Sequence, residues 1–327
     1  MKRKTNLKLI ILFLHIIFAN TFMLQAQINT NLPVGAIPGA IDVSPMGAAT
    51  YTIPIEVVPG TQGMQPNLSI VYNSFGGMGL LGMKWNLAGL SAITRCGQTP
   101  YYDNNISTIG FGKIANTIAL DGERLIKTAT INADGVFSEF ATEVENFMRV
   151  YAHGTFVNGG PNQTTHFKAY TEDGTIIEYG NTSDSRQTVS PNVVLSWYIS
   201  KITDVNGNYM TFQYGGQNTG EIWIEEIQYT GNTGLTPYTK VQFSYKTLPE
   251  KLGNNTHFVG GYAIPQTKLL ETVTVLYGSS TVRQYKFLYN TEDSGEHTTH
   301  LKEVLLYGGN GLLRRFHKLI YQYNRLR

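Results

Sequence analysis

Short runs of alternating apolar and polar residues, separated by turn-forming dipeptides, recur along almost the whole sequence. After Gln27, no segment keeps an apolar period of 3.6 residues long enough to predict an amphipathic helix. Tight hairpin turns need positive φ angles, which Asn, Asp and Gly accept. Four dipeptides between the runs are of this type: Asp121-Gly122, Asp134-Gly135, Asp173-Gly174 and Asn206-Gly207. The pattern predicts an all-β protein built from antiparallel hairpins.

The predicted strands are short and cover most of the chain. They comprise residues 50–57, 68–73, 85–94, 117–120, 124–130, 146–152, 166–171, 175–179, 194–203, 209–214, 222–230, 239–246, 269–277, 282–289, 301–307 and 315–323. Aromatic residues make up 12 % of the 327 residues and favour strands. Charged residues make up only 15 %, which argues against coiled coils and solvated helices.

The last 130 residues contain four strand–turn–strand segments, each closed by an aromatic-x-Tyr pair. The segments are Trp197–Tyr214, Ile222–Tyr245, Leu269–Tyr289 and Leu301–Tyr323, and their closing pairs are Phe212/Tyr214, Phe243/Tyr245, Phe287/Tyr289 and Tyr321/Tyr323. The spacing between the closing tyrosines is uneven, so the repeat is degenerate. A single hairpin cannot bury its apolar face alone, so we expect the hairpins to stack edge to edge in a row.

The amino terminus has the layout of a secretory signal peptide. Basic residues at 2, 3, 4 and 8 precede an apolar run over residues 9–19, and the small residue Ala26 follows at a suitable cleavage position. The apolar run is shorter than the roughly 20 residues that span a bilayer. The sequence therefore predicts export, cleavage after Ala26, and no stable membrane span in the mature chain.

The charge distribution argues against a nucleic-acid partner. The whole chain has a net charge of +2, but residues 1–26 hold four basic and no acidic side chains. The remainder carries 21 basic and 23 acidic side chains, a net charge of −2. No basic footprint of the kind that binds phosphate backbones is present.

Two short motifs match ligand-binding patterns only in part. Gly77–Gly82 fits the G-x-G-x-x-G pattern, but a predicted strand follows in place of the helix that would hold a pyrophosphate. Asp204–Asn208 begins like a calcium loop, but Tyr209 and Gly215 occupy the positions that need Gly and Glu. We interpret both as turns and predict neither a cofactor nor a metal.

Candidate catalytic residues are equally incomplete. Glu143 and Glu145 form the Glu-x-Glu element of ADP-ribosyltransferases, but the Ser-Thr-Ser-like strand of those enzymes is missing; if both lie in a strand, they share one solvated face. His297 and His300 lie in a polar stretch typical of a surface loop. Cys96 is the only cysteine, and no base accompanies it in the sequence. The sequence predicts no enzyme and no catalytic residue.

Several ordered segments resemble the start of the SpvB family, which comprises the Salmonella virulence plasmid 65 kDa B protein and the B subunits of insecticidal Tc toxin complexes. The matching segments are residues 39–55 (GAIDVSPMGAATYTIPI), 59–74 (PGTQGMQPNLSIVYNS), 79–87 (GLLGMKWNL), 120–125 (LDGERL), 172–180 (EDGTIIEYG) and 197–209 (WYISKITDVNGNY). The later hairpins resemble RHS-like (YD) repeats. None of the matching residues is an obvious acid, base or ligand, so the signature is architectural.

The resemblance implies a curved β-sheet that forms part of a hollow shell. In Tc complexes such a shell encloses a toxic polypeptide, and the B subunit also carries a propeller that docks onto a pore-forming subunit. SpvB carries an ADP-ribosyltransferase domain at its far carboxyl end. This sequence stops at Arg327, before any propeller, long repeat array or toxin domain, so we expect a fragment or a stand-alone exported module.

These observations predict three regions: the signal peptide at 1–26, an SpvB-type β region at 27–215, and degenerate RHS-like hairpins at 216–327 that continue it. The predicted function is that of a secreted, non-enzymatic structural module of a toxin-like system. Its expected partners are proteins: the remaining shell or toxin subunits, or a carboxyl-terminal continuation. Two alternatives stay open, a glycan- or protein-binding module that uses exposed aromatic residues, and an ADP-ribosyltransferase toxin.

Overall fold

The computed structural model describes residues 37–110, 117–133, 135–154, 156–157, 160–161, 164–191, 193–216, 219–248, 255–290 and 299–319. These described residues all belong to one compact unit. Ala26, the export signal, His297 and the closing pair Tyr321/Tyr323 lie outside the described residues. The predictions made for them therefore stay predictions.

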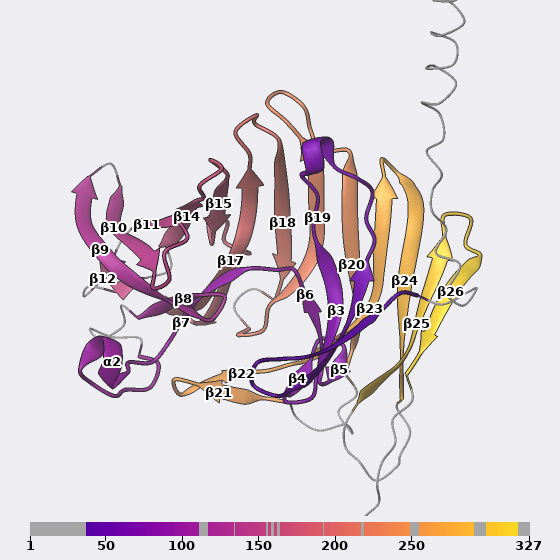
Figure 1. Cartoon of the computed structure of the whole chain (residues 1–327), viewed down its shortest axis with the longest axis horizontal. Coiled ribbons are helices and arrows are strands. Elements are labelled where there is room, and N and C mark those ends of the chain that lie inside the picture. Colours follow the sequence, from indigo (N-terminus) through magenta and orange to yellow (C-terminus); the bar gives the residue numbers. More distant parts are fainter. Residues whose placement is uncertain are drawn as a thin grey trace, which may run out of the picture. The chain divides into compact units, whose positions relative to one another are not determined.

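Eight strands between residues 92 and 203 form a closed ring. They pair antiparallel in the order β15-β14-β11-β10-β9-β8-β7-β17, and β17 pairs back to β15. The strands are β7 (Ala92–Arg95), β8 (Ile118–Leu120), β9 (Glu123–Ala133), β10 (Val136–Thr142), β11 (Arg149–His153), β14 (His166–Tyr170), β15 (Ile176–Tyr179) and β17 (Val193–Thr203). Closing a sheet in this way removes its edges along the ring (Figure 1).

The ring is filled by side chains from its own strands. Alternate residues point inward, so that Val150 and Phe167 are fully buried while their strand neighbours are partly exposed. The Trp197 side chain is also fully buried, and its ring lies 5.1 Å from that of Phe167 at 80°. The guanidinium of Arg95 lies 5.2 Å from the Trp197 ring centroid, and its Nε donates to the Val194 carbonyl at 2.6 Å. Burial lowers the pKa of Arg95 to about 10.

Seven further strands extend the same sheet in an open row beyond β17. In order, they are β18 (Tyr209–Gly215), β19 (Trp223–Gly231), β20 (Thr239–Thr247), β23 (Lys268–Tyr277), β24 (Ser280–Asn290), β25 (His300–Gly308) and β26 (Leu313–Lys318). Each pairs antiparallel with its predecessor, so the four predicted hairpins lie side by side in chain order (Figure 1). We call these seven strands the open sheet. The predicted all-β fold is confirmed.

The closing tyrosines explain why the aromatic-x-Tyr pair recurs. The hydroxyl of Tyr214 donates to the Ile199 carbonyl at 2.7 Å, and that of Tyr245 donates to the Ile224 carbonyl at 2.6 Å. Tyr289 donates to the Leu270 carbonyl in the same way. In each case a tyrosine on the second strand of a hairpin donates to a backbone carbonyl of the first strand. Burial raises the pKa of all three hydroxyls, so they stay protonated as donors.

A second, four-stranded sheet covers the apolar face of the open sheet. We call it the cover; its strands pair in the order β1 (Ala40–Val43), β2 (Ala49–Ile55), β3 (Leu68–Asn73) and β6 (Trp85–Ala88). The amide of Glu56 donates to the Tyr285 hydroxyl at 3.0 Å, and the Tyr229 hydroxyl donates to the Val58 carbonyl at 2.9 Å. The buried side chains of both sheets belong to one hydrophobic core.

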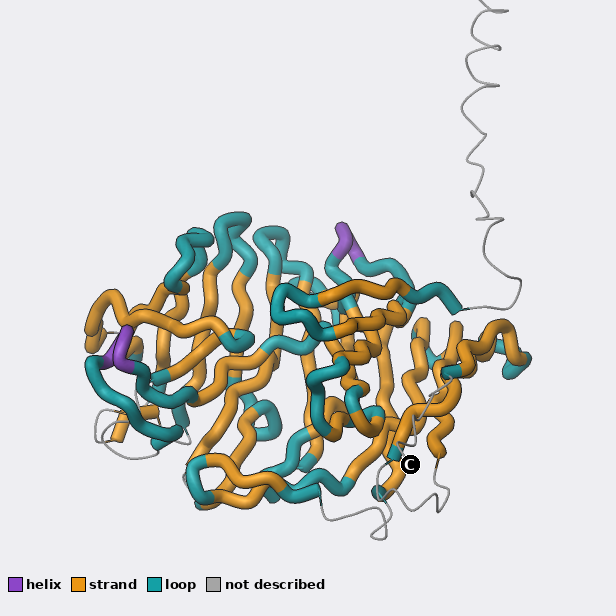
Figure 2. The backbone as a smooth tube through the Cα atoms, turned by 60° about the horizontal axis from the view of Figure 1, so that its bottom comes forward, coloured by secondary structure: helices purple, strands orange, loops and turns teal. Residues whose placement is uncertain are grey.

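Shorter elements join these parts. They are the 3-10 turn η1 (Thr61–Gly63), the hairpin β4 (Met78–Gly79) and β5 (Gly82–Met83), the single helical turn α2 (Pro100–Asp103), the hairpin β12 (Phe156–Val157) and β13 (Gly160–Pro161), the side strand β16 (Arg186–Ser190) on β17, and the hairpin β21 (His257–Val259) and β22 (Tyr262–Ile264). Figure 2 shows how little of the described chain is helical. No helix in this part of the chain is long and apolar enough to cross a membrane.

The structure departs from the predicted strands in a few places. The predicted strand 85–94 is two strands, β6 and β7, because Gly89 adopts a φ of +100° and a Cβ atom there would lie 2.0 Å from the Asn67 carbonyl oxygen. Strands β1, β10 and β16 and the short strands β4, β5, β12, β13, β21 and β22 were not predicted. The strand predicted at 146–152 begins only at Arg149.

Candidate functional site

The open sheet ends on a free strand. Among the strands that the structure describes, β26 pairs only with β25, whereas the opposite end of the pairing order returns to β17 and closes. A free edge presents unpaired backbone groups that can template another strand. Among the described strands, and apart from the side strand β16, β26 is therefore the end at which the large sheet can be extended.

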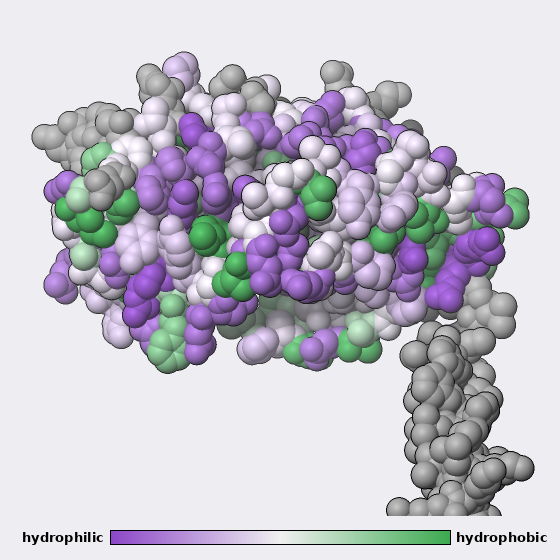
Figure 3. Space-filling view, turned by 90° about the horizontal axis from the view of Figure 1, so that it is seen from above, coloured by the Kyte–Doolittle hydropathy of each residue, from purple (hydrophilic) through white to green (hydrophobic). Residues whose placement is uncertain are grey.

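The side chains of β26 are both basic and apolar. Arg314, Arg315 and Lys318 are exposed, as are Leu313 (51 %) and Phe316 (52 %). Charge on an edge strand discourages indiscriminate pairing, while exposed apolar side chains favour a covering partner. Seen from above, hydrophobic and hydrophilic residues intermix at the end of the molecule that carries β26 (Figure 3, right).

The edge of the cover lies at the same end as β26. The ring of His317 in β26 lies 5.4 Å from that of Tyr51 in β2, and Tyr51 pairs with Ile41 in the edge strand β1. Ile41 and Val43 are 80 % and 64 % exposed. Both layers thus end together, each on an edge strand with exposed apolar side chains. Sequence reasoning missed this juxtaposition because β1 and β26 lie at opposite ends of the described chain.

Apart from the free edge, the structure has a concave region beside α2 with a volume of about 800 Å³. Arg124 dominates it: the guanidinium pairs with the Asp103 carboxylate at 2.8 Å and lies over the Tyr102 ring, 5.3 Å from the centroid. The Tyr102 hydroxyl donates to the Glu143 carboxylate, which raises the pKa of Tyr102 to about 12. The charges of this region thus compensate one another.

Cys96 lies at the border of the same region. An Arg124 nitrogen lies 3.7 Å from its sulfur, but burial outweighs that contact and raises the pKa of the thiol. A nucleophilic cysteine needs a lowered pKa to form its thiolate. The arrangement indicates a structural thiol, as the sequence predicts.

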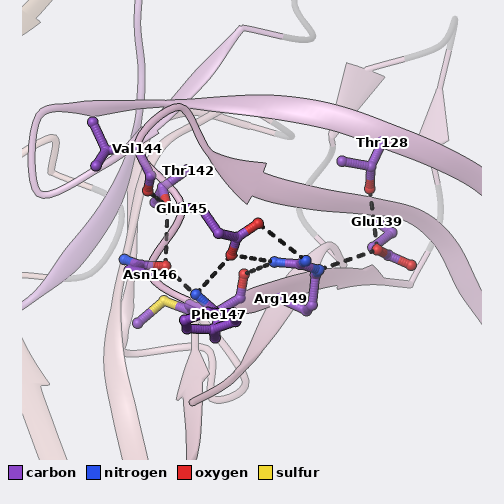
Figure 4. A network of polar contacts seen from close by, with 9 residues as sticks. Thr128, Glu139, Thr142, Val144, Glu145, Asn146, Phe147 and Arg149 are labelled. Atoms are coloured by element: carbon purple, nitrogen blue, oxygen red, sulfur yellow. Dashed lines mark hydrogen bonds and ion pairs between the residues drawn. The ribbon is translucent and has the colours of Figure 1, made fainter. Parts of the chain in front are cut away.

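The two acidic residues of the Glu-x-Glu element do not lie in a strand. Glu143 and Glu145 occupy the loop between β10 and β11, so they do not share the face of a strand. The Glu145 carboxylate accepts two hydrogen bonds from Arg149, at 3.0 and 3.2 Å, and one from the Phe147 amide at 2.6 Å (Figure 4). These bonds lower the pKa of Glu145. Its carboxylate serves to hold the loop.

The two partial ligand motifs are turns, as expected. The Asp204 carboxylate accepts hydrogen bonds from the amides of Asn206 and Asn208 at 2.8 and 2.9 Å and from the Asn208 side chain at 2.8 Å, which stabilises the hairpin turn. The glycine-rich segment 77–82 lies in the β4–β5 hairpin. His300 lies in β25. Within the described ranges, no group of three or more His, Cys, Asp or Glu residues is placed to hold a metal ion.

One pair of titratable side chains, His153 and His166, was not predicted from the sequence. His153 of β11 and His166 of β14 are cross-strand partners, and their rings stack at 5.2 Å and 12°. Burial lowers the pKa of both, and each is further lowered by nearby positive charge. Only the pairing of β11 with β14 brings them together.

In the part of the chain that the structure describes, three pairs of exposed or partly exposed tyrosines do not form a flat platform. The pairs Tyr101/Tyr102, Tyr151/Tyr170 and Tyr238/Tyr277 each meet edge to face, at 84°, 81° and 78°. Sugar-binding surfaces of the type considered above need several co-planar rings in a groove. These pairs therefore do not favour the glycan-binding alternative.

Comparison with protein families gives a direct match. The family model described as SpvB, the Salmonella virulence plasmid 65kDa B protein, matches residues 43–245, which is well over half of the chain. The chain belongs to the SpvB family. The matched residues run from the cover through the ring to β20. No match was found among curated proteins.

Solved structures with the same fold come from toxin proteins. The SpvB-family chain aligns with a crystal structure of TcdB2-TccC3 at a TM-score of 0.67 and 14 % identity, covering 88 % of this chain and 17 % of that one. It aligns with the Photorhabdus luminescens Tc holotoxin pore at a TM-score of 0.62 and 15 % identity, covering 88 % and 16 %. The N-terminal domain of effector protein SpvB from Salmonella typhimurium strain LT2 aligns at 0.57 and 16 % identity, covering 78 % and 99 %.

These similarities show the fold and the family, and the resemblance noted from the sequence is confirmed. The chain spans only about a sixth of the length of the Tc chains that it matches, but almost the whole length of the SpvB N-terminal domain. It is therefore a Tc- and SpvB-related module.

Proposed function

We propose that this SpvB-family chain is an exported, non-enzymatic structural module that contributes to a β-shell enclosing or presenting a toxin polypeptide. The observation that carries the proposal is the one-sided architecture of the large sheet: the ring closes one end, and β26 leaves the other free. A sheet of this kind grows in one direction only. The predicted signal peptide with cleavage after Ala26, the secreted localisation and the boundaries at 26 and 215 belong to the same proposal.

The expected partner is a protein that supplies the next strand. An added strand would pair with the backbone of β26, and its side chains would cover Leu313 and Phe316. That strand belongs to a shell subunit, a toxin subunit or a continuation of this polypeptide. The degenerate hairpins would then be the beginning of an RHS-like row.

Self-association tests the free edge. We expect light scattering of residues 27–327 to show association that grows with protein concentration, because the edges of two copies can pair in the absence of the natural partner. The variant Phe316→Lys should weaken this association, since it adds charge to the edge. Leu235→Lys is the matched control, because Leu235 is 66 % exposed in the turn between β19 and β20.

A stable monomer at all concentrations, with the amides of 313–318 protected from hydrogen exchange, would contradict the proposal.

The proposal that the chain is not an enzyme has its own test. Incubation with labelled NAD and actin should leave actin unlabelled. Labelling that disappears in Glu145→Gln would assign the activity to this loop and overturn the structural role of its carboxylate.

A further inference from the structure

A cavity of about 400 Å³ lies where the ring, the open sheet, the cover and two short hairpins meet. Its walls come from β4, β6, β16, β17, β18, β19 and the β21–β22 hairpin. Small-molecule sites favour such junctions and have volumes in this range. The free edge of β26 contributes no residue to the cavity.

The walls are apolar and aromatic, and part of their surface is left uncovered. Leu80, Leu90 and Ile222 line the cavity and are only partly buried, although comparable side chains on these sheets are fully buried. The rings of Tyr198 and Tyr214 lie 5.6 Å apart on one side. Apolar surface without cover is what a ligand with an apolar body would bury.

The polar groups of the cavity suit a neutral ligand. The Glu221 carboxylate is buried and already accepts hydrogen bonds from the Thr267 amide at 2.7 Å, the Thr267 hydroxyl at 2.6 Å and the Lys268 amide at 3.1 Å. The Lys268 ammonium lies 5.4 Å from the Trp223 ring centroid, so a positive charge of the protein already lies against that ring. Lys268 lies outside the cavity lining, so its ammonium would be met by a ligand cation that stacks on Trp223, whereas a ligand anion would meet Glu221.

Uncharged hydrogen-bonding groups also line the cavity. The Tyr198 hydroxyl has no hydrogen-bond partner among the described residues, and burial raises its pKa, so it is available as a donor. Gln266 uses its Nε2 to bond the Gly79 carbonyl at 2.6 Å, which leaves its amide oxygen as an acceptor. One donor and one acceptor beside aromatic walls match a neutral amide attached to an aromatic ring.

We propose that this cavity binds a neutral aromatic group carrying an amide, either a free small molecule or an aromatic residue of an extended polypeptide. The site is independent of the free edge, so the failure of either proposal leaves the other intact. It would also let one ligand contact the ring, the open sheet and the cover together.

Three matched probes test the charge preference: N-acetylphenylalaninamide, the cation phenylalaninamide and the anion N-acetylphenylalanine. Binding to the full chain is measured by saturation-transfer NMR and by tryptophan fluorescence. Trp223 lines the cavity and is partly exposed, while Trp85 and Trp197 are 2 % and 0 % exposed, so a fluorescence change that Trp223→Phe abolishes locates the probe. We expect the neutral probe to bind at least about tenfold more tightly than either charged one.

Two variants make the test specific. Tyr198→Phe should weaken the neutral probe about three- to tenfold with an unchanged thermal midpoint, because only one hydrogen bond is lost. Leu80→Arg should abolish binding by placing a charge in the cavity, whereas Leu312→Arg, at a 62 % exposed position outside it, should not. Equal binding to Leu80→Arg, tighter binding of the cation, or no binding of any probe would overturn the proposal.

A final comparison distinguishes the two sources of the ligand. A blocked Gly-Gly-Phe-Gly-Gly peptide that binds as well as N-acetylphenylalaninamide would support a polypeptide segment. Exclusion of the peptide, with retained binding of the small probe, would support a free small molecule.

Discussion

The closed ring and the open sheet use similar antiparallel strands but bury their apolar faces in different ways. One face of the ring's sheet points inward, and its own side chains, such as Phe167 and Trp197, fill the space inside the ring. The open sheet cannot do so, and its apolar face is buried by a cover built from residues more than 100 positions earlier in the chain. The ring is thus locally complete, whereas the open sheet depends on distant segments and on whatever covers β26.

The largest expected effect is in the ring. Trp197→Ala should lower the free energy of unfolding by about 4 kcal/mol, because it empties the space that Phe167 and Arg95 pack against. Urea denaturation measures the loss. Trp223→Ala, at a partly exposed position of β19, is the control and should cost clearly less. Equal losses would mean that the ring is no more tightly packed than the open sheet.

A slightly smaller effect is expected in the cover. Ile53→Ala removes a fully buried side chain of β2 and should cost about 3 kcal/mol. Hydrogen exchange should distinguish it from the ring variant: the amides of β19–β24 should lose protection while those of β9–β11 keep theirs. Uniform loss of protection in both regions would show that they unfold as one unit.

Removing single tyrosine hydroxyl groups compares a hydrogen bond between the two layers with a hydrogen bond within one hairpin. Tyr285→Phe removes the acceptor of the Glu56 amide and should cost about 1–2 kcal/mol, because a partly buried donor loses its partner. Tyr214→Phe removes a bond within one hairpin and should cost about 1 kcal/mol. Thermal unfolding of the two variants, which differ from the parent by one oxygen each, measures both. A larger loss of unfolding free energy in Tyr214→Phe than in Tyr285→Phe would show that the bond within the hairpin contributes more to stability than the bond between the layers.

The smallest expected effect is the pH dependence of the ring. The folded-state pKa of His153 and His166 is lowered, so the unfolded chain binds more protons once the pH falls below the ordinary histidine pKa of about 6.5. The stability that the neutral pair contributes is complete above that pH and is lost as the pH falls through it. Denaturation between about pH 5 and 7.5 should show this slope, and the double variant His153→Gln/His166→Gln should flatten it. An unchanged slope in the double variant would assign it to other groups.

Much of the strand content was predictable because alternation records which face of a strand is buried. The hairpins from β17 to β25 begin and end close to the predicted residues, since their apolar residues alternate clearly. Strands β10 and β16 were missed because their sequences, VFSEFAT and RQTVS, do not alternate in this way. Their pairing is decided by neighbours that lie elsewhere in the chain.

The candidate sites were less predictable than the strands. The turn at Asp204 could be recognised from local residues, because its hydrogen bonds lie within a few positions of the chain. The cavity beside Tyr198, the stacked histidines and the shared end of β1 and β26 each bring together residues from several distant segments. No pattern of neighbouring residues in the sequence predicts that these distant segments lie together.

The sequence by itself determined most of the strands, most of the hairpin turns, the closing tyrosines Tyr214, Tyr245 and Tyr289, and the family, because each depends on residues that are neighbours in the chain. Only the tertiary structure decided that β15 returns to β17, that residues 40–88 cover the open sheet, and that Glu143 and Glu145 lie in a loop. Pairing between strands and packing between layers depend on backbone hydrogen bonds and buried area. Backbone hydrogen bonds join strands that are distant in the sequence and do not depend on side-chain identity. Buried apolar area depends little on which apolar residue provides it.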